Sequence, residues 1–165
     1  MAAFSFRQSM INEIDIRHAK RRGEWAELRF MARAAEHGLG VAKPWGDSSP
    51  YDFVVEHNGH FLRVQVKCTR YRRGNSYKCN VTSNGVPYAP ADLDFLAAYV
   101  IPADAWYIIP VEALHGQPQI LLTPHRDDSK YAAYREAWHL LHFDLETCPW
   151  RTPCLDRLLT AHQTT

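Results

Sequence analysis

The chain has few of the residues that mark disulfide scaffolds or structural metal sites. Its 165 residues include four cysteines, and no two of them have the short C-x-x-C spacing of zinc knuckles. We interpret His139 and His142 with Cys148 and Cys154 as scattered residues rather than zinc ligands. No run of about 20 apolar residues could span a bilayer, and the first residues do not resemble a secretory signal. We therefore expect a cytoplasmic protein with reduced thiols and no membrane partner.

An excess of charge of one sign is also absent. The 19 Lys and Arg residues nearly balance the 18 Asp and Glu residues, which leaves a formal net charge of +1. Any contact with nucleic acid must therefore come from local patches. With 46% hydrophobic residues and no internal repeat, the chain predicts one domain over residues 1–165. Residues 1–17 are a possible arm, and residues 144–165 a C-terminal extension.

The stretch from Tyr51 to Lys67, YDFVVEHNGHFLRVQVK, predicts a β-hairpin. Asn58-Gly59 suits a two-residue type I′ turn, because both central positions of that turn need positive φ. If these residues form the turn, the register places Asp52 opposite Gln65. The hairpin therefore brings together residues that are 13 positions apart in the sequence.

The open end of this hairpin is polar on one face. Side chains alternate between faces, so Asp52 shares a face with Gln65 and Lys67, while the other face is entirely apolar. Cross-strand Cβ atoms are roughly 5 Å apart and diagonal ones about 7 to 8 Å, so the three side chains converge. Mg²⁺ prefers hard oxygen ligands, which Asp52 and the Gln65 carbonyl could supply. Lys67 could orient a water and offset charge on a phosphodiester. The alternative is a plain surface ion pair between Asp52 and Lys67.

A helix is predicted from about residue 16 or 18 to His37, and Gly38 ends it. Spacing of 100° per residue places Glu27 within an apolar arc. The other members of this arc are Phe30, Met31, Ala34 and Ala35. A carboxylate there needs a partner or a metal, because burying an unpaired charge is costly. Glu24, at the edge of the arc, is the competing candidate, although the helix dipole alone would favour an acid there.

The order Glu27, Asp52, Gln65-Val66-Lys67 resembles the PD-(D/E)XK nuclease superfamily, whose motif is an acid, a spacer and then acid-x-lysine. The segment KRRGEWAELRFMARAAEHGLGVAKPWGDSSPYDFVV is similar to that of Holliday-junction resolvases and of a cyanobacterial group I intron homing endonuclease group. That homing endonuclease group also has glutamine in place of the second acid. The resemblance covers about residues 19–112.

This resemblance implies an α/β fold of the restriction-endonuclease type, with a central mixed β-sheet flanked by helices. It implies Mg²⁺-dependent hydrolysis of DNA phosphodiester bonds, with Mn²⁺ as a possible substitute. Asp52, Gln65 and Glu27 would hold the metal, and Lys67 would complete the catalytic set. Gln65 departs from the usual pattern, since it removes one negative charge from the metal site. DNA substrates further favour a homo-oligomer, a dimer or higher.

A basic and aromatic stretch follows Lys67, with a turn predicted at Gly74-Asn75. Its members are Arg70, Tyr71, Arg72, Arg73, Tyr77 and Lys78. Cations here would neutralise backbone phosphates, and tyrosines could pack on sugars or bases. The alternative for each single residue is a solvated hairpin tip. Proximity to Lys67 favours DNA binding for the patch as a whole.

The remaining elements complete the predicted sheet. We expect strands at Leu39–Pro44, Asp92–Val100, Ala105–Pro110 and Ile120–Leu122, a loop at Pro87–Pro90, and a helix at Asp128–His142. The aromatic residues of that helix would be core or an oligomer interface.

A non-catalytic nucleic-acid-binding or partner-binding protein with this fold is the alternative to an enzyme. The joint presence of Glu27, Asp52 and Lys67 favours the enzyme.

Overall fold

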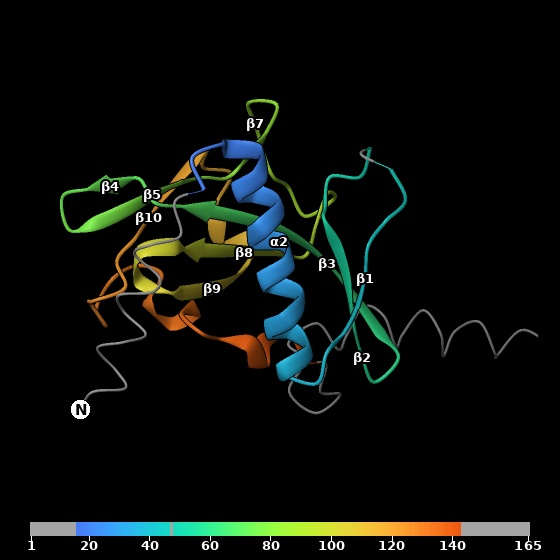
Figure 1. Cartoon of the computed structure of the whole chain (residues 1–165). Coiled ribbons are helices and arrows are strands. Elements are labelled where there is room, and N and C mark those ends of the chain that lie inside the picture. Colours follow the sequence, from blue (N-terminus) through green and yellow to red (C-terminus); the bar gives the residue numbers. More distant parts are fainter. Residues whose placement is uncertain (1–15, 47, 143–165) are drawn as a thin grey trace, which may run out of the picture.

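The computed structural model describes residues 16–46 and 48–142. Its centre is a five-stranded mixed sheet with the order β1-β2-β3-β8-β9 (Figure 1). The strands are β1 (Gly40–Ala42), β2 (Phe53–His57), β3 (His60–Thr69), β8 (Phe95–Val100) and β9 (Ala105–Pro110). Strands β3 and β8 are parallel, and the other neighbours are antiparallel. The predicted α/β class with a central mixed sheet is confirmed.

The β2–β3 hairpin has the register that the sequence predicts. His57 pairs with His60, and Phe53 pairs with Val64. Asn58 and Gly59 form the turn with φ angles of 51° and 77°, which is the left-handed region that this turn type requires. The predicted apolar face is buried at Phe53, Val55, Val64 and Val66.

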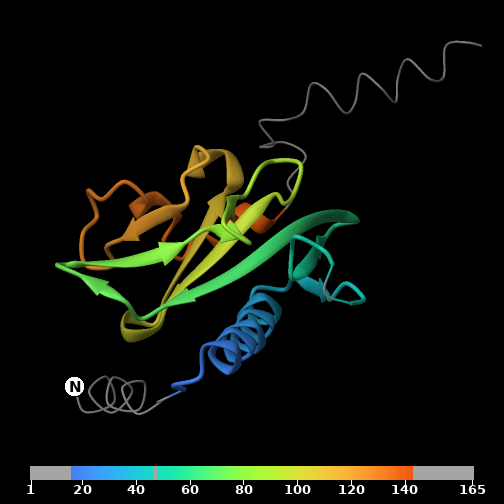
Figure 2. The same ribbon diagram turned by 90° about the horizontal axis from the view of Figure 1, so that it is seen from above.

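Helix α2 (Ala19–Glu36) covers one face of the sheet (Figure 2). It ends as predicted at Gly38, which has φ of 73° and donates its N–H to Ala35 O, while Leu39 N–H bonds to Ala34 O. This pair of bonds is a Schellman motif, which satisfies the last carbonyls of the helix. The apolar face predicted for this helix is wrong at one edge, where two of its residues are exposed. Ala26, Phe30 and Ala34 are buried, whereas Met31 and Ala35 are exposed, because the buried stripe lies further toward Ala26.

A smaller sheet covers the other face and has the order β10-β5-β4. Its strands are β4 (Arg72–Arg73), β5 (Ser76–Asn80) and β10 (Gln119–Leu122), and a separate pair is formed by β6 (Thr82–Ser83) and β7 (Val86–Pro87). Tyr77, Cys79 and Ile120 of this sheet pack against Leu96 and Ile109 of the central sheet. The predicted turn at Gly74-Asn75 is confirmed between β4 and β5. Several boundaries differ from prediction. Pro87 belongs to β7, β8 begins only at Phe95, β1 is shorter than Leu39–Pro44 at both ends, and β10 begins one residue earlier, at Gln119.

The helix predicted at Asp128–His142 is wrong. Two short 3-10 turns, η3 (Ala132–Tyr134) and η4 (Trp138–Leu141), take its place, and Glu136 between them has φ of 51°. The Glu136 N–H donates to Trp106 O at 2.8 Å, and its carboxylate accepts bonds from Trp106 N (2.7 Å) and Trp138 Nε1 (2.9 Å). These contacts with β9 override the helical spacing.

The predicted role of the aromatic residues in this segment as core is confirmed for Tyr131 and Trp138, which are buried. The other 3-10 turns are η1 (Ile101–Ala103) and η2 (Val111–Leu114). Within residues 16–46 and 48–142, α2 is the only α-helix. In the same part of the chain, no helix has the length and apolar character needed to cross a membrane. Most of the predicted N-terminal arm and the whole extension at 144–165 lie outside the described residues.

Candidate nuclease site

Asp52 and Gln65 meet at the open end of the β2–β3 hairpin, as the register predicts. Gln65 Nε2 donates to Asp52 Oδ2 at 2.6 Å, and the backbone N–H of Val66 donates to the same oxygen at 2.8 Å. Val66 lies beyond the last β2–β3 pair, so the carboxylate satisfies an N–H that the strand no longer pairs. Gln65 is only 8% exposed, and its Nε2 also donates to Val66 O at 3.2 Å. The amide hydrogens are thus committed, and Oε1 is the Gln65 atom that could coordinate a cation.

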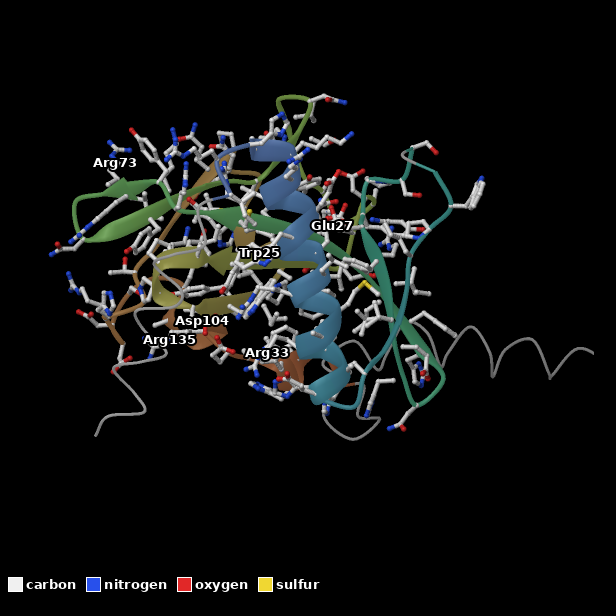
Figure 3. All side chains as sticks on the ribbon, in the orientation of Figure 1. Trp25, Glu27, Arg33, Arg73, Asp104 and Arg135 are labelled. Carbon is white, nitrogen blue, oxygen red and sulfur yellow. The ribbon has the colours of Figure 1, made fainter. Side chains whose placement is uncertain are left out.

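Glu27 approaches this pair from α2. Figure 3 shows it on the side of the helix that faces β2 and β3. Its side chain is 23% exposed and accepts a hydrogen bond from Lys43 Nζ at 2.7 Å. Sequence reasoning expected a metal or Lys67 as its partner and missed Lys43. The rival candidate Glu24 is exposed, so the partly buried acid of the helix is Glu27.

The environment of Asp52 disfavours its charged form. Burial raises the pKa of Asp52, and the nearby negative charge of Glu27 raises it further, while the bonds from Val66 and Gln65 and the charge of Lys67 oppose these effects. Two carboxylates that repel each other in a partly dry site are stabilised by a cation between them. The electrostatics of the site therefore favour cation binding.

Lys67 is the fourth residue at this end of the hairpin. Its ammonium lies 5.5 Å from the ring centroid of Tyr88, a residue of the segment after β7 that is 5% exposed. Burial raises the pKa of the Tyr88 hydroxyl, and a hydrogen bond with Lys67 and the charge of Lys67 oppose that rise. Tyr88 therefore holds the lysine from the side away from α2. No motif marks Tyr88 in the sequence, because it follows Lys67 by 21 positions in a segment of irregular spacing.

We name Glu27, Asp52, Gln65 and Lys67 the acid–lysine cluster. Two carboxylates and an amide oxygen are the hard ligands that Mg²⁺ prefers, and Mg²⁺ commonly keeps several waters besides one or two carboxylates. Among the described residues, no group of three or more His, Cys, Asp and Glu could hold a metal. A site in this region therefore depends on the Gln65 oxygen as well as on the two acids. The donor set fits a hard divalent cation.

A groove of about 640 Å³ begins at Lys67 and runs toward the β4–β5 hairpin. We name it the basic groove; its lining residues are Arg22, Lys67, Cys68, Thr69, Arg70, Tyr71, Arg72, Lys78 and Asn80. Five of these nine residues are Lys or Arg, so the groove is positive although the chain as a whole is nearly neutral. Arg22 comes from α2 and was not predicted as a member, because the sequence gives no sign that it lies near β3.

Four of the five residues predicted to bind DNA line the basic groove, namely Arg70, Tyr71, Arg72 and Lys78. The fifth, Arg73, lies near the tip of the β4–β5 hairpin, well away from Glu27 (Figure 3). The prediction that Tyr77 belongs to the DNA-binding patch is wrong. Tyr77 is 8% exposed and packs in the core, because alternation along β5 turns it inward and Lys78 outward.

Comparisons with known proteins agree with this geometry. A family model described as PD-(D/E)XK endonuclease matches residues 17–141, which contain the whole acid–lysine cluster and the basic groove. Among solved structures, the bacterial homing endonuclease I-Ssp6803I is similar, with a TM-score of 0.65 and 32% sequence identity. That likeness covers 75% of this chain and 91% of the homing endonuclease chain. The search of curated proteins found no match.

Proposed function

This chain belongs to the PD-(D/E)XK endonuclease family, and we propose that it is a Mg²⁺-dependent endonuclease that hydrolyses DNA phosphodiester bonds. The observation that carries the proposal is the bond between Asp52 Oδ2 and Gln65 Nε2, at 2.6 Å, beside Lys67 on the same strand. It fixes an acid, an amide and a lysine in the order of the family motif. The similar solved structure is itself a homing endonuclease, which supports the choice of substrate.

Each member of the acid–lysine cluster has a distinct part in this proposal. Asp52 and Gln65 would hold the metal; their free atoms are Oδ1 and Oε1, because Asp52 Oδ2 and Gln65 Nε2 already bond to each other and to Val66. Glu27 supplements them from α2. When bound, Mg²⁺ supplies Lewis-acid activation of a water and charge neutralisation at the phosphate. Lys67 positions the attacking water and offsets the negative charge that develops on the phosphate oxygens.

The basic groove carries the DNA backbone to this centre. Its cations come from four elements and one connecting loop: Arg22 on α2, Lys67 on β3, Arg72 on β4, Lys78 on β5, and Arg70 between β3 and β4. Phosphate contacts of this kind position a duplex without reading its sequence. Tyr71 is 66% exposed and could pack on a sugar or base. Two cuts on opposite strands need two such centres, so we further propose that the protein acts as a homo-oligomer. We also propose that it acts in the cytoplasm, because Cys68 and Cys79 are free thiols, as is usual in a reducing compartment.

The test is cleavage of supercoiled plasmid and branched DNA with Mg²⁺ or Mn²⁺, compared with EDTA. Asp52→Ala and Lys67→Ala are the test variants, and Lys130→Ala, an exposed lysine outside the groove, is the matched control. We expect metal-dependent nicking or linearisation that both test variants lose and the control keeps. No cutting on any substrate, with DNA binding unchanged in the variants, would instead establish a non-catalytic binding module. No binding either would overturn the nucleic-acid function altogether.

A further inference from the structure

Lys43 lies against the acid–lysine cluster, and the proposed function gives it no role. It is the first residue after β1, and its Nζ donates to Glu27 Oε2 at 2.7 Å. The Lys43 side chain is 60% exposed, whereas that of Glu27 is 23% exposed. The ion pair therefore joins an exposed ammonium to a mostly buried carboxylate of the cluster.

The sheet register explains why Lys43 reaches the helix. The last β1–β2 pair joins Ala42 to Val54, so Lys43 follows beside Phe53, the neighbour of Asp52. Alternation places Lys43 on the same face as Phe53, which is the face that α2 covers. Its Nζ lies 5.7 Å from the Phe53 ring centroid, in agreement with this placement. The edge strand thus delivers a cation to the helix glutamate, one residue away from the backbone of Asp52.

An ammonium and a divalent cation at Glu27 compete for the negative charge of one carboxylate. Glu27 Oε2 already accepts the Lys43 bond, so a metal that uses Glu27 would either replace the ammonium at Oε2 or bind Oε1 of the same carboxylate close to it. The two positive centres would also repel each other at such short range. Lys67 does not relieve this conflict, because it lies at Tyr88 on another side of the cluster.

We propose that Lys43 is a built-in competitor of the metal. In the metal-free protein its ammonium neutralises Glu27 and limits the repulsion between Glu27 and Asp52. A divalent cation held by Glu27 would have to weaken or replace this ion pair. This competition raises the metal concentration at which the nuclease becomes active. This inference rests on the proposed metal-dependent function and adds a residue that sets its metal requirement.

The test measures Mn²⁺ affinity by isothermal titration calorimetry without DNA. Lys43→Met removes the charge and keeps the side-chain length, and we expect it to bind Mn²⁺ about fivefold more tightly than the unmodified protein. Glu27→Gln and the double variant Glu27→Gln/Lys43→Met complete the cycle. The gain should vanish in the Glu27→Gln background, because the competition acts through that carboxylate. Lys130→Met is the matched control, since its ammonium also lies over an aromatic ring, 5.1 Å from the centroid of Tyr131.

The outcomes separate this inference from the proposed function. An equal gain in both backgrounds would overturn the inference in favour of a general charge effect. Unchanged or weaker binding by Lys43→Met would overturn it while metal binding by the protein stands. No Mn²⁺ binding by the unmodified protein would overturn the metal-dependent function itself, and the inference with it. In cleavage assays, Lys43→Met should be faster only at limiting Mn²⁺.

Discussion

The acid–lysine cluster and the basic groove share strand β3 but are built in different ways. In the cluster, Gln65 is 8% exposed and Asp52 is bonded to both a side chain and a backbone N–H. In the groove, Arg70 and Arg72 are exposed, and Tyr71 is 66% exposed. A change of charge in the cluster should therefore alter the stability of the fold as well as the chemistry. A change of charge at the exposed groove residues, which do not belong to the cluster, should alter DNA affinity alone.

Gln65→Glu tests this contrast most severely. The new carboxylate would lose the bond to Asp52 and face its negative charge in a buried position. We expect the free energy of unfolding at pH 7 in EDTA to fall by about 2–4 kcal/mol. Mn²⁺ should recover part of this loss, because a divalent cation neutralises the added charge. Urea unfolding with and without Mn²⁺ measures both effects.

Gln117→Glu is the matched control, since Gln117 is exposed in a turn and the same change there should cost less than about 0.5 kcal/mol. Equal stability of Gln65→Glu and the unmodified protein in EDTA would show that the cluster tolerates charge. The cluster would then not differ from the groove in how its charge affects stability.

In the basic groove we expect the opposite result, a loss of DNA affinity without a loss of stability. Arg72→Ala/Lys78→Ala should weaken DNA binding about tenfold or more at ~0.1 M salt and make the plot of log affinity against log salt shallower by about two units. Stability should change by less than about 0.5 kcal/mol, because Arg72 is exposed and Lys78 points outward from β5. Fluorescence anisotropy across a salt series measures the slope. Arg126→Ala/Lys130→Ala, also exposed, is the control. An unchanged slope would remove these two residues from the DNA interface.

The two regions also differ in how far the sequence predicts them. Asn58-Gly59 fixes the turn, the turn fixes the register, and the register brings Asp52 to Gln65. That part of the cluster follows from local rules. The groove was predicted because its members Arg70 to Lys78 are close together along the chain. Arg22 and Tyr88 were missed, because only the packing of α2 and of the segment after β7 brings them to Lys67.

Long-range contacts account for the errors. Helical spacing at Asp128–His142 gave a wrong prediction, since Glu136 takes a positive φ to bond to Trp106 and Trp138. The Lys43 partner of Glu27 was missed because it depends on which strand lies at the sheet edge. Period and turn chemistry predict local structure, whereas the partner of a charged side chain depends on the assembled fold.

Asp52→Asn should raise stability while abolishing cleavage. The raised pKa of Asp52 means that the folded protein disfavours its charged form, mainly because the carboxyl is buried. At pH 7 in EDTA, the neutral isostere should increase the free energy of unfolding by about 1 kcal/mol. A raised pKa contributes stability that is present at low pH and is lost as pH rises through the folded value. The gap between the variant and the unmodified protein should therefore shrink as pH falls and close below about pH 4.

Urea unfolding of both proteins between pH 7 and pH 3.5 measures this gap. Asp128→Asn is the control with the opposite sign, since Arg126 lowers the pKa of Asp128 at the surface, and its variant should gain no stability. An Asp52→Asn protein less stable than the parent at pH 7 would show that the carboxylate is well compensated in the absence of metal. The electrostatic basis for cation binding would then be lost.

The smallest expected effect concerns Tyr88, which joins the two regions by holding Lys67. Tyr88→Phe keeps the ring under the ammonium and removes the hydroxyl. We expect the cleavage rate at saturating DNA to fall about three- to fivefold with unchanged DNA affinity, because a polar contact between the Tyr88 hydroxyl and Lys67 is worth roughly 1 kcal/mol. Tyr131→Phe is the matched control, since Tyr131 is buried in the same core and, in the described part of the chain, its hydroxyl has no hydrogen-bond partner. A fall in rate equal to that of the control, or one explained by weaker DNA binding, would leave Tyr88 as a core residue and would place Lys67 under the control of the acids alone.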